Sequence, residues 1–182
     1  MKCPVCKRNT LKPVVLEPNL TVQGCEKCGG YWLSSEAYWH WLEQQEEVSP
    51  EQPSEVVVAV NDNEQAKLCP TCGRILIKYK VGHGVNFCLD QCSACNGVWL
   101  DKHEWQALKT RSLHAEIHGM FSKSWQQRVL AAELRHNLER MYEQRFGAAD
   151  YAELQRLRQW LAQHPQRAAL LAYLSDDDPY RF

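Results

Sequence analysis

The feature that most constrains this chain is a repeated arrangement of eight of its nine cysteines. Each half of the arrangement is a C-x-x-C pair, then 18 or 19 residues, then a second C-x-x-C pair. The two sets are Cys3, Cys6, Cys25 and Cys28, and Cys69, Cys72, Cys92 and Cys95. A C-x-x-C turn places two sulfur atoms on one side of a tight loop, so two turns supply the four thiolates of a structural zinc site. We therefore predict two zinc ions per chain, with these eight residues as the metal ligands.

The second set is a near-copy of the first, which indicates an internal duplication. Equivalent cysteines are separated by 66 or 67 residues. Both sets open with Cys-Pro, and both end with a glycine, one further residue and Trp-Leu, at residues 30–33 and 97–100. Because Trp32 and Trp99 follow their last cysteines by four residues, each indole is placed to cover the sulfur atoms. We interpret both tryptophans as structural.

Between its cysteine pairs, each set carries the pattern of a β-hairpin. Residues 11–17 and 20–23 are predicted strands in the first set, and residues 74–80 and 85–89 in the second, with turn residues between them. Metal turns at one end of a β-hairpin form a zinc ribbon. A ribbon of about 30 residues buries too little apolar surface to fold alone, so metal binding supplies most of its folding free energy.

Helices are predicted after each ribbon and through the C-terminal third. Asp101 followed by Glu104 has the spacing of a capping box, and Ser34 is placed to cap the corresponding helix of the first copy. Beyond Thr110, apolar residues recur at helical spacing up to Phe146. Two further helices are predicted, one capped by Asp150 and one opening near Pro165, before an exposed acidic tail.

The fold class we expect is a small metal-stabilised α+β protein: two zinc-ribbon β-hairpins, each followed by a helix, and an α-helical C-terminal region. Residues 1–47 form the first ribbon with its helix, and residues 67–110 form the second. Residues 48–66 are an acidic linker with a candidate edge strand at 55–60, and residues 111–182 are the helical region with its acidic tail.

These residues resemble the small bacterial zinc-finger family related to the zinc ribbon of transcription factor IIB. The family pattern is a CPxC turn, a hairpin, a second CxxC turn, a glycine, Trp-Leu-Asp and a glutamate that opens a helix. Besides its cysteines, the second copy matches at Gly97, Trp99, Leu100, Asp101 and Glu104. The first copy departs at the helix start, where Ser34 replaces the aspartate and Glu36 stands one position early. The resemblance implies zinc binding and a link to transcription.

Other chemistry is open to some of these residues. Paired C-x-x-C turns also hold iron in rubredoxin-like sites, form disulfides in oxidising compartments, or act in redox catalysis. Cys88 is the ninth cysteine, read either as a small apolar strand residue or as a spare thiol that replaces a ligand under stress. His114 and His118 stand four residues apart, which suits a solvated helix face or a metal pair, but no third ligand is evident.

The charge balance bears on the partner. Eight thiolates contribute −8 and two zinc ions +4, which takes the formal charge of −1 to −5. Nucleic-acid binders usually carry a basic surplus, so we expect a protein partner, with the transcription machinery as a candidate. The alternative is a DNA or RNA binder that uses the basic second hairpin, at Arg74, Lys78, Lys80 and His83.

No stretch of about 18 apolar residues is present, so we expect no membrane span. Thiolates stay available for metal in a reducing compartment, so we expect a cytoplasmic protein. No constellation of nucleophile and base and no phosphate-binding glycine loop is evident. We therefore expect a non-enzymatic protein-interaction scaffold.

Overall fold

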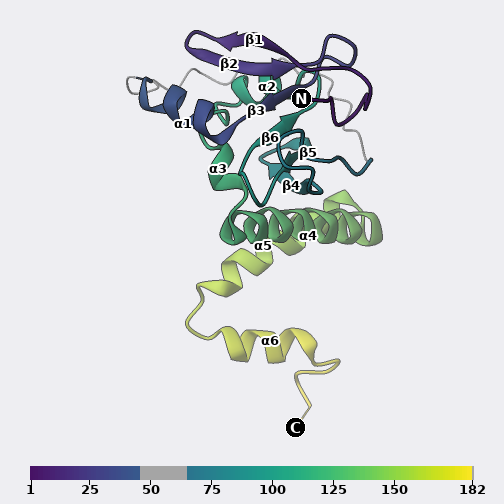
Figure 1. Cartoon of the computed structure of the whole chain (residues 1–182). Coiled ribbons are helices and arrows are strands. Elements are labelled where there is room, and N and C mark those ends of the chain that lie inside the picture. Colours follow the sequence, from purple (N-terminus) through teal and green to yellow (C-terminus); the bar gives the residue numbers. More distant parts are fainter. Residues whose placement is uncertain (46–64, 182) are drawn as a thin grey trace. The chain divides into compact units, whose positions relative to one another are not determined.

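The computed structural model describes residues 1–45 and 65–181 of the chain (Figure 1). The chain divides into two compact units, residues 1–130 and residues 131–182, which we call the ribbon unit and the tail unit. The candidate strand at residues 55–60 lies outside the described residues. Within the described ranges, no helix is both long enough and apolar enough to cross a membrane.

Both predicted hairpins are present in the ribbon unit. Strands β1 (Lys12–Glu17) and β2 (Leu20–Gly24) pair in antiparallel fashion, as do β4 (Ile77–Gly82) and β5 (Val85–Gln91). The first hairpin turns at Asn19, which has a positive φ of 64°. The second turns at a histidine and a glycine with φ of 53° and 76°. Turn residues thus lie where the chain must adopt left-handed backbone geometry.

A single six-stranded sheet joins the two ribbons, which the sequence did not lead us to expect. After its last metal turn, each ribbon forms one more short strand, β3 (Tyr31–Leu33) or β6 (Val98–Leu100). These two strands pair antiparallel at the centre of the sheet, whose order is β1-β2-β3-β6-β5-β4. Trp32 lies opposite its own equivalent, Trp99. The order and the register are therefore those of two equivalent halves related by a two-fold axis.

Short helices cover the sheet and complete the hydrophobic core. They are α1 (Ser35–Glu43), α2 (Glu104–Lys109) and α3 (Ile117–Met120), followed by the start of α4 (Lys123–Phe146). Ser34 caps α1 as predicted, because its hydroxyl accepts a hydrogen bond of 3.2 Å from the N–H of Ala37.

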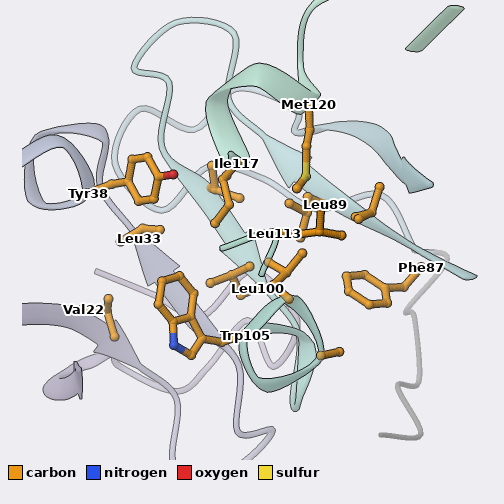
Figure 2. Packing of buried hydrophobic residues seen from close by; sticks show 14 of the residues in the cluster. Val22, Leu33, Tyr38, Phe87, Leu89, Leu100, Trp105, Leu113, Ile117 and Met120 are labelled. Atoms are coloured by element: carbon orange, nitrogen blue, oxygen red, sulfur yellow. The ribbon is translucent and has the colours of Figure 1, made fainter. Parts of the chain in front are cut away.

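The core draws on both ribbons (Figure 2). Leu33 and Tyr38 from the first ribbon module belong to the same buried cluster as Leu100, Trp105 and Ile117. The Tyr38 hydroxyl donates a hydrogen bond of 3.1 Å to the carbonyl of the buried residue 114. Each ribbon therefore gains apolar surface that it lacks alone.

The first turn of α4 caps the outer edge of β4. The side-chain amide of Gln126 accepts from the N–H of Lys80 at 3.2 Å and donates to the C=O of Lys80 at 2.8 Å. The indole N–H of Trp125 donates to the C=O of Val81 at 3.0 Å. These side chains occupy backbone groups that an added strand would need, so this edge is blocked against pairing.

The tail unit is helical, as predicted. It contains the C-terminal part of α4, then α5 (Ala148–Ala162) and α6 (Arg167–Ser175). The predicted stop at Gly147 is confirmed, since this glycine has a φ of 84° between α4 and α5. The predicted cap at Asp150 is wrong. Helix α5 begins directly after the glycine, so Asp150 lies inside its first turn.

Candidate metal centres

The structure brings the eight predicted cysteines together in two groups of four. In each group the four Sγ atoms lie within 4.8 Å of one another. In the first group, the Sγ atoms of Cys3 and Cys28 are 3.6 Å apart and those of Cys6 and Cys25 are 3.9 Å apart. In the second, the matching Sγ distances are 3.6 Å (first and fourth cysteines) and 3.4 Å (second and third cysteines). The two halves of the duplication thus build the same cluster.

These distances test whether zinc fits. Four sulfurs bound at about 2.3 Å to a central zinc, at the corners of a tetrahedron, lie about 3.8 Å from one another. The sulfur separations of 3.4 to 3.9 Å bracket that value. Each group can therefore bind one zinc ion, and four thiolates fill its tetrahedral shell.

All four C-x-x-C turns share one backbone device. In each, the N–H of the residue after the second cysteine donates to the C=O of the first cysteine, at 2.8 or 2.9 Å. That residue has a positive φ between 56° and 74°, and the four are Lys7, Gly29, Gly73 and Asn96. Glycine and asparagine adopt this conformation most readily, so three of the four positions carry a suitable residue.

Burial differs within each pair in a regular way. The first cysteine of every pair is buried, with at most 3% of its surface exposed, whereas the second is half-buried or exposed. Backbone N–H groups also point at the sulfurs: those of Cys6 and Cys72 lie 3.3 and 3.4 Å from the Sγ atoms of Cys3 and Cys69. Such donors stabilise the thiolate form that a metal requires.

The pKa values of these thiols depend on burial and on the backbone donors. Burial raises the pKa of Cys3 to about 11 and that of Cys69 to about 12. Burial also acts to raise the pKa of Cys25 and Cys92, but donated backbone N–H bonds lower it further, to about 7 and about 6. Zinc binding near neutral pH must therefore displace protons from the more resistant thiols.

The two conserved-type tryptophans of the repeat reach across to the opposite ribbon. A Cβ atom placed on Gly97 would lie 2.3 Å from Cζ2 of Trp32, and one on Gly30 would lie 2.3 Å from Cζ2 of Trp99. Both indoles are buried in one cluster with the first cysteine of each of the four pairs. Each tryptophan thus packs beside the metal turn of the other ribbon, and the glycines provide the space.

Comparison with known families agrees with this geometry. Residues 2–44 and 68–111 each match the family described as the transcription factor zinc-finger, a zinc ribbon of the transcription factor IIB type. The two modules are zinc ribbons of this family. Searches of curated proteins and of solved structures gave no significant match. The family match covers both copies, so the resemblance stated from the sequence is confirmed.

The second zinc ribbon contains a buried charge network that the sequence reasoning missed. The ammonium group of Lys67, 1% exposed, lies 2.5 Å from Asp90 and 2.8 Å from Asp101. The other carboxylate oxygen of Asp101 accepts from the indole N–H of Trp99 at 2.7 Å. Burial acts to lower the pKa of Lys67, but the bonds to the two aspartates outweigh it and raise that pKa. The lysine therefore stays charged in the core.

This network also corrects the predicted capping box. Glu104 accepts from the backbone N–H of Asp101 at 2.7 Å, as the motif requires. The Asp101 carboxylate is engaged by Lys67 and Trp99, and the residue at the helix cap is His103, with a φ of 73° and no side-chain cap bond.

The first zinc ribbon has no counterpart of this network. At the offsets of 66 and 67 residues that relate the two copies, the three charged positions correspond to Met1, Gln23 and Ser34. All three ionic groups are thus replaced by neutral ones, so the ribbons differ in how their interiors are stabilised.

The remaining candidate residues lie outside the two cysteine groups. Cys88 is half-buried on β5, opposite Lys80, and is a member of neither group. The solvated face proposed for the two histidines is wrong for His114, which is buried between Trp41 and Trp105, with ring centroids about 6 Å away. His118 is half-buried and stacks on Trp39 at 4.7 Å. Among the described residues, neither histidine joins a group of three or more metal-type ligands.

The basic hairpin residues are partly engaged within the ribbon unit. The Lys78 ammonium lies 3.9 Å from Asp90, and 30% of its side chain is exposed. The ring of His83 packs against Trp125 at 4.9 Å, and its carbonyl accepts from Arg111 at 2.8 Å. Arg111 thus brings one more positive charge to the turn between β4 and β5.

Proposed function

We propose that this chain is a non-enzymatic, zinc-dependent scaffold that holds a protein partner, with the transcription machinery as the candidate. The observation that carries the proposal is the ligand set. Each centre offers four cysteine sulfurs to one metal, so a bound zinc has no position left for water or substrate. Zinc then acts by holding each ribbon in shape, which is what a binding scaffold needs.

The link to transcription rests on family. The modules match a family described as a transcription factor zinc-finger. Fold alone does not decide function, so the link needs a measurement of its own. A cytoplasmic location accords with the proposal, because a reducing compartment keeps cysteine thiolates available to zinc.

Charge supports a protein partner over nucleic acid. With both zinc ions counted, eight thiolates at −8 and two ions at +4 take the formal charge of −1 to −5. A phosphate backbone is attracted by the opposite balance. The alternative function, DNA or RNA binding through the basic second hairpin, predicts a complex that weakens steeply with salt, whereas an apolar protein interface does not.

The test is native mass spectrometry of the full chain, purified gently from its own cells, followed by a salt series on the complex. The proposal predicts two zinc ions per chain and a bound protein that is retained in high salt. A matched Cys3→Ser/Cys25→Ser variant, which lacks two ligands of the first centre, should lose one zinc ion and the partner. A nuclease-sensitive complex that dissociates as salt rises would instead establish the alternative, and turnover of a substrate would contradict both.

A further inference from the structure

The tail unit leaves nearly all of its large apolar side chains exposed. Within residues 131–181, Leu161 is the one buried side chain. Eight large apolar residues on α4 and α5 are between 37% and 60% exposed: Leu134, Leu138, Met141, Tyr142, Phe146, Leu154, Leu157 and Trp160. Taken by itself, this unit is a set of helices without a core.

Such helices need a cover. Most helical stability in proteins comes from packing of an apolar face, and short isolated helices are marginal in water. The exposed residues of α4 are not scattered, since Leu134, Leu138 and Met141 recur at steps of four and three and so share one face. Contiguous apolar faces of this kind mark interaction surfaces.

The charges beside this stripe indicate what covers it. At about 100° per residue, Glu133 and Arg140 lie along one flank, and Arg135 and Glu139 lie along the other. Each flank thus carries one acidic and one basic residue. A partner surface of a single sign would meet a like charge on both flanks, whereas a surface of the same mixed pattern meets an opposite one.

We infer that the tail unit is a dimerisation surface and that its partner is a second copy of this chain. In an antiparallel pair of α4 helices that cross near Asn137, each flank meets the same flank of the other copy with its direction reversed. Glu133 then stands opposite Arg140, and Arg135 stands opposite Glu139. Both flanks are satisfied by the same crossing point, which is the self-complementarity that a two-fold interface requires.

The area and relief of the surface fit this partner. At their observed exposures the eight side chains present on the order of 700 Å², close to the roughly 800 Å² per partner of a standard stable interface. A groove of about 820 Å³ lies beside them, with an apolar floor formed by Phe146, Leu154, Leu157 and Trp160. Its rim carries Asp150, Glu153 and Arg156, again of both signs.

The inference is independent of the scaffold function, because self-association is measured on the purified chain alone. Sedimentation velocity of the full, zinc-loaded protein should show a species of twice the 21.1 kDa chain mass. Its population should rise with concentration between about 1 and about 100 µM. Far-UV circular dichroism should show helicity rising over the same range.

Two variants separate this surface from others. Leu134→Gln/Leu138→Gln removes apolar area with a good helix former and adds no charge, so it should weaken the dimer at least about 100-fold. His136→Gln/Glu143→Gln changes the opposite face of α4 and should leave the dimer unchanged. Native mass spectrometry should find two zinc ions on each variant, which verifies that the ribbon unit is folded.

A wild-type protein that stays monomeric up to about 100 µM overturns the inference. It is also overturned if the leucine variant dimerises as well as the wild type, because the contact then lies elsewhere.

Discussion

Replacing Gly97 with alanine tests whether the two zinc ribbons depend on each other. The new Cβ atom would lie 2.3 Å from Cζ2, 2.8 Å from Cη2 and 3.0 Å from Cε2 of Trp32. All three atoms belong to one rigid indole that is 2% exposed. Gly97 has no positive φ, so alanine fits its backbone, and the cost arises from contact with the other ribbon.

The magnitude follows from two opposed terms. Overpacking of a rigid, buried group costs about 1 to 3 kcal/mol, and the shortest contact here puts the cost at the upper end. Alanine restricts the unfolded chain more than glycine does, which returns about 0.4 to 1 kcal/mol. We expect Gly97→Ala to lower the free energy of unfolding by about 2 kcal/mol.

The assay is urea unfolding at a fixed, buffered concentration of free zinc, followed by near-UV circular dichroism. Gly119→Ala is the matched control, because a Cβ there meets nothing within 4 Å and α3 tolerates alanine. The decisive comparison repeats Gly97→Ala in a Trp32→Leu background, where the clashing ring is gone. There the glycine substitution should cost less than about 0.5 kcal/mol.

An equal cost in both backgrounds would refute the reasoning, since the penalty would then not come from the indole. So would a Gly97→Ala protein as stable as the Gly119→Ala control.

Three further predictions concern single residues. Lys67→Ala leaves two buried carboxylates without their countercharge and should cost about 3 to 5 kcal/mol in urea unfolding, with Lys67→Met no better than alanine unless the aspartates are changed too. Cys88→Ser should retain two zinc ions by native mass spectrometry, whereas Cys28→Ser should retain one. Burial acts to raise the pKa of Glu17, but hydrogen bonds from a lysine ammonium and an indole N–H lower it below its ordinary value of 4.5. Its charge therefore contributes stability above that pH, which is lost as pH falls through the folded-state pKa, so Glu17→Gln should lose less stability than wild type on acidification to about pH 4.

The parts of the molecule that follow from local spacing were predictable. The C-x-x-C pairs, the hairpins and the long apolar periodicity before Gly147 are each contained within a few tens of residues, and each has a distinct pattern. The zinc ligands belong to this class. Their clustering depends on hairpins that the sequence already indicated.

The joint between the ribbons was not predictable in the same way. Strands β3 and β6 have three residues each, too few for alternation to be recognised, and they pair across 67 positions of sequence. The role of Asp101 was misjudged for a related reason. Its spacing from Glu104 is a local signal, but the lysine that takes its carboxylate lies 34 residues away.

The joint is also a surface that a single ribbon shares with a copy of itself. Because each central strand meets its own equivalent, one unduplicated ribbon carries all that is needed to form the same pair as a homodimer. Tandem duplication of a gene for such a ribbon places both partners on one polypeptide, where pairing no longer depends on protein concentration. Symmetry then ceases to bind the two halves to one sequence. The lysine and aspartates buried in one half alone, opposite Met1, Gln23 and Ser34 in the other, are a divergence that a true homodimer cannot make.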